Sequence, residues 1–525
     1  MWHIESRPHK KWCPPKHSVV LISTDGYLAG EKKREGLFTL YTDSVDRGPS
    51  GPRKTLRFIS NAGWLTIGNI AGDLSGLLYF VILSRYFGLT GIGQYSYAFT
   101  IASFMSGLVD FGCSEYGIRE CARISLEARR RLMGQLLAIQ LSILIVGSII
   151  LFGLFLYTST PYEKIVVILL LTCYQCAMVF AATLFVPSFA QQSMVYPAIA
   201  RMVSRISGTL TSICLAIWIH TSLALTLIPF PITASILVVA AVISAVYYVG
   251  KFSLSFDLSH IRILLHTLLP FAASPFFAEM NFRVGMVMLS QFQGDEIAGM
   301  YATSLKFLVL GLWPLEFLAL AAYPCLSARY LQKGDHFTQT MSRLLRISLV
   351  TGGLLAWMLI FVAPQMLVPL FGAQFVQVIP FMKAMSIIVL CYTLDIVSHR
   401  LLAAMGLQSK RVKVQFAGII LNLLLSFVFT PIYGIIGAMF SLIISVSVIN
   451  IACYRILWNI EAIKIEIVGI LNSFFTCLLV SVSVGAFTRW FSGYHWLSAV
   501  LSMLTFVAMS YTSRNHTNYI PHRVL

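Results

Sequence analysis

The hydrophobic residues of this chain gather in long unbroken runs between short polar segments, without the alternation that marks half-buried β-strands. Each run reaches the length of about 20 residues that an α-helix needs to cross a bilayer. We therefore predict an all-α polytopic membrane protein, and the continuous runs argue against a transmembrane β-barrel. The fourteen predicted spans are 62–83, 94–114, 132–157, 163–186, 198–219, 226–249, 263–290, 297–326, 344–366, 378–403, 412–432, 433–454, 467–487 and 493–512.

The segments between the spans differ in charge on alternate sides. Segments 115–131, 327–346 and 399–413 carry clusters of arginine and lysine. The opposite segments hold only three basic residues: Arg85, Lys164 and Arg489. Because positive charge marks cytoplasmic loops, this alternation predicts that both termini are cytoplasmic.

Two stretches of the chain repeat one plan: a glycine-rich corner, an apolar span with an acid, and a basic segment. They are residues 87–123 and 292–329. Gly93 recurs as Gly299, an offset of 206 residues, and at the same offset Asp110 falls on Glu316. A duplication of this kind predicts two similar halves.

The duplication predicts two lobes of six spans each, with helices 1–6 in residues 58–250 and helices 7–12 in residues 251–455. Residues 456–525 then hold the last two helices and a short cytoplasmic tail. An even number of spans per copy gives parallel repeats, with the substrate site between them and alternating access by rocking of the lobes. Residues 1–57 are polar and aperiodic, and we expect a disordered extension or a start assigned too early.

Composition supports the membrane assignment, with 57% hydrophobic residues, 11% charged residues and a mean hydropathy of +0.79. Soluble proteins carry about 25% charged residues. The net charge of +17 could suggest nucleic acid, but eleven of the 38 basic residues lie in residues 1–57 and most others lie in loops. We therefore expect membrane lipids, and no nucleic acid, as partners.

The sequence lacks the signatures of an enzyme. It contains no phosphate-binding loop of the Walker A type and no HExxH or GxSxG motif. Its ten cysteines lie almost entirely inside spans, and Cys173 and Cys176 are expected to pack within a helix. We predict neither catalysis nor a cofactor nor a metal site.

Ionisable residues inside spans are costly in lipid and normally face an interior cavity. The candidate acids are Asp73, Asp110, Glu279, Glu316 and Asp395. The candidate bases are Arg85, Arg283, Lys306 and Lys383. Asp110, Arg85 and Asp395 lie near span edges, where contacts with loops or headgroups can explain them.

The deeper charges are the stronger candidates for a cavity. Asp73 and Glu279 are related by the same 206-residue offset, and Glu279 precedes Arg283 by one helical turn, which favours an ion pair. A purely structural pair is the main alternative for these two residues. Pro270 and Pro275 predict a kinked or broken helix just before them.

Two further features have simpler explanations. Arg201 and Arg205, at the start of a span, are expected to anchor the topology. Gly68, Gly72 and Gly76 form a stripe of small residues that favours close helix packing.

The segments GNIAGDLSGLLYFVILSRYFGLTGIGQYSYAFT (68–100) and LVDFGCSEYGIRECAR (108–123) resemble the opening of bacterial polysaccharide-biosynthesis exporters. That family contains the O-antigen and exopolysaccharide flippases. Its superfamily also holds the multidrug and toxin extrusion transporters and the lipid II flippase. The resemblance extends over about residues 55–512, and fourteen spans are typical of the family.

The resemblance implies that undecaprenyl-pyrophosphate-linked oligosaccharide units move from the cytoplasmic to the periplasmic leaflet of the inner membrane, for surface polysaccharide assembly. It also implies a cationic cavity, here with contributions from Arg283, Lys306, Lys383 and Arg85. The acids could bind a coupling proton or Na⁺, or could hold these bases in place. A polysaccharide polymerase and a chain-length regulator are the implied protein partners.

Two other functions remain open at this point. A cation-coupled multidrug exporter of the same fold would have a cavity dominated by acids, whereas this sequence places several bases in its spans. A membrane-embedded glycosyltransferase or polymerase is disfavoured because polymerases of this pathway carry a large periplasmic loop, and no outward segment here is long.

Overall fold

The computed structural model describes residues 52–158, 160–218, 222–254, 258–331 and 335–458, and within these ranges the only regular structure is helical. The helices are α2 (Pro52–Asp110), α3 (Cys113–Cys121), α4 (Leu126–Thr158), α5 (Tyr162–Leu184), α6 (Val186–Ala190), α7 (Val195–Trp218), α8 (Leu223–Leu227), α9 (Pro229–Val249), α10 (Leu258–Phe292), α11 (Asp295–Leu331), α12 (Asp335–Phe361), α13 (Ala363–Phe371), the 3₁₀ helix η1 (Ala373–Val378), α14 (Ile379–Ala404) and α15 (Gln408–Trp458).

Nine helical stretches in the described ranges are long and apolar enough to cross a membrane. The chain is therefore an all-α polytopic membrane protein, as its apolar runs predict. Every predicted span before residue 459 coincides with a helix. The spans predicted at 467–487 and 493–512 lie outside the described residues, as does most of the predicted extension 1–57.

Two of the helices each join two predicted spans through a single glycine. In α2 the backbone leaves the helical conformation at Gly88, with φ 64° and ψ −161°. In α15 it does so at Gly434, with φ 56° and ψ −129°. A positive φ strains any residue that has a Cβ, so glycine permits these sharp corners between consecutive spans.

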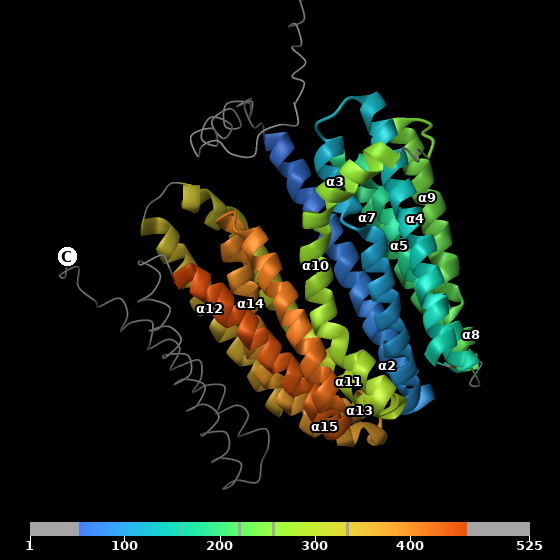
Figure 1. Ribbon diagram of the computed structural model, residues 1–525, viewed down its shortest axis with the longest axis vertical. Helices are drawn as coiled ribbons and strands as arrows, with labels where there is room; N and C mark the ends of the chain where they lie inside the picture. The colour runs from blue at the N-terminus through green and yellow to red at the C-terminus, as the bar shows by residue number, and fades with distance from the viewer. Residues whose placement is uncertain (1–51, 159, 219–221, 255–257, 332–334, 459–525) are drawn as a thin grey trace, which may run out of the picture. The chain divides into compact units, whose positions relative to one another are not determined.

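The described helices pack mainly with neighbours from the same half of the sequence. Helices α4, α5, α7 and α9 lie together on one side of Figure 1, and α12, α14 and α15 lie together on the other. Helix α11 packs against α12 and α14. The lobe boundaries 58–250 and 251–455 stay a prediction.

Helix α10 contacts both groups. It continues through Pro270 and Pro275 without a break, and the kink predicted there stays a prediction. Its first half packs against α3, where Leu268 is buried in a cluster with cysteines of α3. Its second half packs against α15, where Asn422 Nδ2 donates a hydrogen bond of 2.8 Å to the carbonyl of Asn281.

The two copies of the sequence repeat contact each other reciprocally. A Cβ on Gly93 would lie 1.7 Å from the carbonyl oxygen of Asp295, and a Cβ on Gly299 would lie 2.0 Å from that of Leu89. Leu89 and Asp295 are themselves separated by the repeat offset of 206. Such an exchange of equivalent contacts is what a two-fold relation between the copies produces. We call this end of the helices the Gly93 end.

Polar contacts add to the close approach at the Gly93 end. Asp295 Oδ1 accepts hydrogen bonds from Lys164 Nζ at 2.7 Å and from Ser290 Oγ at 2.6 Å. The Lys164 and Asp295 side chains are only 13% and 16% exposed. The Arg85 guanidinium donates to the carbonyl oxygens of Pro369 and Leu370 near the end of α13. The first and second halves of the chain are thus held together here by backbone proximity and by charge.

We predict that Gly299→Ala destabilises the protein. The added methyl group would overlap the Leu89 carbonyl, so α2 and α11 would have to separate, and overpacking of this kind costs about 1–3 kcal/mol. Gly311→Ala in the same helix is the control, because a Cβ there meets nothing within 4 Å. The thermal unfolding temperature of the purified protein should fall for the first variant alone. Equal unfolding temperatures would contradict the close approach.

Candidate functional site: a charged cavity

Two adjoining cavities of about 150 and 250 Å³ lie between residues of α2, α5, α7, α9, α10 and α11. They share the side chains of Tyr95, Phe99, Arg283, Lys306 and Val309, so we treat them as one central cavity. It therefore combines residues from both halves of the sequence. The role of this cavity as the substrate site stays a prediction.

Two ion pairs at the central cavity involve acids that are related by the sequence repeat. Arg205 Nη2 of α7 donates to Asp73 Oδ1 of α2 at 2.8 Å. Arg283 Nε donates to Glu279 Oε1 one turn earlier in α10. Asp73 and Glu279 are 206 residues apart. Each acid therefore neutralises one arginine of the cavity.

Lys306 is the third base of the central cavity and has no carboxylate partner within the described ranges. Its Nζ lies 5.5 Å from the centre of the Phe80 ring, a distance at which a cation is attracted by the ring face. Since the other two bases are paired with acids, the cavity carries an excess of one positive charge.

Glycines of α2 make room for this arrangement. A Cβ on Gly72 would lie 2.6 Å from Arg205 Nη1, so the absence of a side chain leaves the space that the guanidinium occupies. Gly68 approaches the carbonyl of Ala198 in α7, where a Cβ would lie at 3.2 Å. Gly76 lines the cavity and would meet nothing. The predicted packing role therefore holds for Gly68, whereas the next two glycines border the cavity.

Aromatic rings from different helices form much of the cavity wall. Tyr79 packs edge-on against Tyr95 and Phe230, with ring centres 5.7 and 5.1 Å apart. Tyr174 of α5 lies 5.2 Å from Phe230. The Arg283 guanidinium carbon lies 5.1 Å from the centre of the Phe99 ring. This wall places aromatic rings beside the positively charged groups of the cavity.

The structure gathers some of the predicted site residues and separates others. Asp73, Arg283 and Lys306 line the central cavity, and Glu279 contacts it through Arg283. Arg85 lies at the Gly93 end, bonded to α13. Lys383, on α14, is also absent from the cavity lining.

The remaining predicted acids have partners outside the central cavity. Ser114 Oγ donates to Asp110 Oδ1 at 2.6 Å, and Arg400 Nη2 lies 3.2 Å from Glu316 Oε2. Asp395 accepts hydrogen bonds from Arg411 Nη2 at both oxygens, at 3.2 and 3.0 Å. The Arg411 side chain is 3% exposed. Each of the three acids thus has a hydrogen-bond or ion-pair partner. The role of these acids in ion coupling stays a prediction.

Arg205 lines the cavity, although its place beside Arg201 at the start of a span predicts a topology anchor. Arg201 lies beside the rings of Phe185 and Phe189, at 5.8 and 5.5 Å, whereas Arg205 one turn further enters the cavity. The available signal was Asp73, an acid in the middle of a span that needs a base. Only the packing of the helices shows that the base that pairs with Asp73 comes from α7.

Comparison with known proteins agrees with this architecture. The family model of polysaccharide biosynthesis proteins matches residues 58–330. The chain belongs to this family. No curated protein sequence matches it.

Solved structures place this family member in a known transporter fold. It is similar to the lipid II flippase MurJ in an inward closed conformation, with a TM-score of 0.65 and 16% identity over 86% of this chain and 98% of that one. It is also similar to an inward-facing multidrug resistance MATE transporter of the MOP superfamily, with a TM-score of 0.54 and 16% identity over 75% and 95% of the two chains.

A third similar structure is a MOP superfamily transporter from Pyrococcus furiosus, with a TM-score of 0.52 and 14% identity over 78% and 96% of the two chains. It is described as having a binding pocket of reversed polarity that suggests a different function. At these identities the likeness shows a shared fold and nothing about cargo.

We predict that Arg205→Gln destabilises the protein because it leaves the Asp73 carboxylate without its base. The double variant Asp73→Asn/Arg205→Gln removes both charges and should recover part of the loss, giving a coupling energy of about 1 kcal/mol. The free energies of unfolding of the four proteins in detergent measure this coupling. Arg201→Gln combined with Asp73→Asn is the control and should give no coupling. If the two single substitutions at Asp73 and Arg205 have additive effects on the free energy of unfolding, the assignment of this ion pair is wrong.

Proposed function

We propose that this protein moves a lipid-linked oligosaccharide, carried on undecaprenyl pyrophosphate, from the cytoplasmic to the periplasmic leaflet of the bacterial inner membrane. The observation that carries the proposal is Lys306, a base without a carboxylate partner in the described ranges, located in a cavity between the two halves of a polysaccharide biosynthesis family member. The reaction is transport by alternating access, with no covalent step.

Electrostatics support an anionic cargo. A pyrophosphate that leaves water needs compensating positive charge, because an unpaired anion in a low-dielectric cavity is strongly destabilised. Lys306 offers that charge directly. Arg283 and Arg205 can exchange their bonds to Glu279 and Asp73 for bonds to phosphate oxygens, to which guanidinium groups bind well. The aromatic wall then provides ring faces for the sugars.

The alternative, a cation-coupled drug exporter, draws less support from the cavity. Such a transporter needs acids that are available to its cargo, whereas Asp73 and Glu279 are each bonded to an arginine. The excess charge of the cavity is also positive. Both features favour an anion.

Alternating access requires the Gly93 end to open. By the predicted topology this end faces the periplasm, because Arg85 and Lys164 belong to the weakly basic side. The contact between Lys164 and Asp295 joins the two halves of the chain there, so it would have to break before cargo could leave outward. The arrangement described here would accordingly be closed toward the periplasm.

We predict that Lys306→Gln reduces surface-polysaccharide export at least about tenfold, since a 1.4 kcal/mol loss of anion binding already gives that factor. Export would be measured as surface polysaccharide on cells that depend on the introduced gene, with protein level followed by immunoblot. Lys383→Gln is the matched control and should export normally, because Lys383 does not line the cavity. Lys306→Arg should retain part of the activity. Normal export by Lys306→Gln at a normal protein level would overturn the proposal.

We also predict that Lys164→Asp opens the Gly93 end, because it places two acids in contact. A cysteine introduced as Ser96→Cys in the cavity wall should then react several-fold faster with a membrane-impermeant maleimide added outside the cell. The double exchange Lys164→Asp/Asp295→Lys should restore slow labelling. Peptide-resolved mass spectrometry separates this site from the native cysteines. If labelling of Ser96→Cys were the same in all three backgrounds, the Lys164 contact would not control access.

A further inference from the structure

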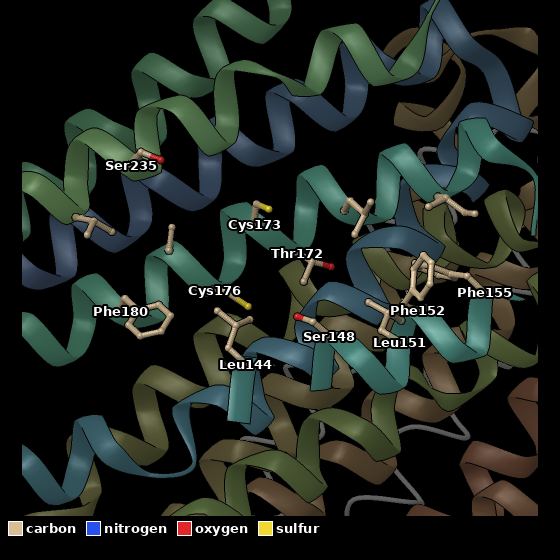
Figure 2. Close-up of a pocket in the computed structure, with 14 residues that line it drawn as sticks. Leu144, Ser148, Leu151, Phe152, Phe155, Thr172, Cys173, Cys176, Phe180 and Ser235 are labelled. Atoms are coloured by element: carbon tan, nitrogen blue, oxygen red, sulfur yellow. The ribbon is translucent and has the colours of Figure 1, made fainter. Parts of the chain in front are cut away.

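A second space, of about 650 Å³, lies on the other face of α5 and has a different character from the central cavity. Figure 2 shows side chains of α4, α5 and α9 around it, with Ser148 and Phe152 from α4 and Thr172, Cys173 and Cys176 from α5. We call it the α4–α5 groove. Its lining is almost entirely apolar, and no charged side chain contributes to it.

The groove lies beside the most exposed part of α4. The buried residues of α4 lie between Leu132 and Gln140 and again at Phe155, and none lies between them. In that middle part the side chains of Ile149 and Ile150 are 67% and 66% exposed and lie outside the groove. The middle turns of α4 thus contain no fully buried side chain, although Gly147 lies against Met105 of α2 and Leu144 packs on a buried cluster.

Helix α5 separates the groove from the central cavity. Thr172, Cys173 and Cys176 line the groove, while Tyr174 lines the cavity. The groove-lining residues all belong to the apolar stretches Leu126–Thr158, Tyr162–Ala190 and Leu223–Val249, which are candidate membrane spans. Because Phe152 and Leu169 are 64% and 47% exposed, the groove opens onto the surface that faces the bilayer.

We propose that the α4–α5 groove holds one acyl chain of a bilayer phospholipid. From Leu144 to Phe155 the α4 wall spans eleven residue steps, about 17 Å at the rise of an α-helix. This is close to half of the roughly 30 Å hydrocarbon thickness, so the groove has the length of a chain from a single leaflet.

Lipid tails are as apolar as the groove lining, so the hydrophobic effect alone does not drive a chain from the bilayer into the groove. A bilayer phospholipid occupies the groove because such lipids are abundant and because an acyl chain packs against the lining. In an empty groove the lining atoms would lack dispersion contacts on one side. The hydrocarbon of the surrounding bilayer can restore these contacts. The hydroxyls in the wall do not require a polar ligand. Ser235 Oγ already donates to the carbonyl of Pro231. The buried hydroxyl of Thr172 has no partner in the structure, and rotation about its Cα–Cβ bond would direct it to the carbonyl one turn back.

The competing occupant is the isoprenoid chain of a lipid-linked cargo, which has the same hydrocarbon chemistry. The position of the groove favours the bilayer lipid, because the groove lies within the first half of the sequence, between α4 and α5. The central cavity instead combines residues from both halves. A resident chain would add packing contacts along the exposed middle of α4.

The test uses the full chain in vesicles of phosphatidylethanolamine and phosphatidylglycerol that contain a phosphatidylethanolamine with a diazirine in its acyl chain. After photolysis, mass spectrometry locates the adducts. We expect adducts on the groove-lining residues of α4 and α5 to exceed those on Ile149 and Ile150 at least about threefold. Ser148→Phe should remove this excess by filling the groove, whereas Ser142→Phe, on an exposed position of the same helix outside the groove, should retain it.

The result would overturn the proposal in three cases: an even spread of adducts, an excess that survives Ser148→Phe, or displacement of the adducts by a few mole per cent of undecaprenyl phosphate. The last outcome would assign the groove to the isoprenoid chain. If Ser148→Phe fails to fold, Ala177→Leu fills the same groove with a smaller side chain and must give the same loss of adducts.

Discussion

Charge compensation at low dielectric is the constraint on which the central cavity depends. An isolated charge between membrane helices is unstable, so each acid at this cavity is bonded to an arginine, Asp73 to Arg205 and Glu279 to Arg283. The two pairs draw on α2, α7 and α10 and thereby hold the wall of the cavity in place. Lys306 has no carboxylate partner among the described residues, and it gives the cavity its excess positive charge.

The duplication imposes a second constraint. Gly93 approaches the carbonyl of Asp295, and Gly299 approaches that of Leu89, so closely that a Cβ would overlap either oxygen. These two contacts bring the two halves together at one end. The same pseudo-symmetry places Asp73 and Glu279 as equivalent acids at the cavity. The second half departs from it by adding Lys306 in α11. The unbalanced charge of the cavity therefore comes from a residue in which the two copies of the repeat differ.

Helix α5 divides two environments within the first half of the chain. On one face Tyr174 meets the aromatic wall of the charged cavity, and on the other Thr172 and Cys173 face an apolar groove. This division follows from helical periodicity, since neighbouring residues point in different directions around the axis. The two faces of one apolar span thus border a charged cavity and an apolar groove.

The sequence by itself determined the membrane class, the positions of the helices up to residue 458, and the family. These depend on local quantities: the length of an apolar run, the placement of basic loops and the motifs of residues 68–123. It also singled out Asp73, Glu279, Arg283 and Lys306, because any charge inside a span is costly. Only the tertiary structure decided which charges meet. Arg205 joined the cavity, and Arg85 and Lys383 did not, since a partner in space depends on how distant helices pack and not on the residues beside it in the chain.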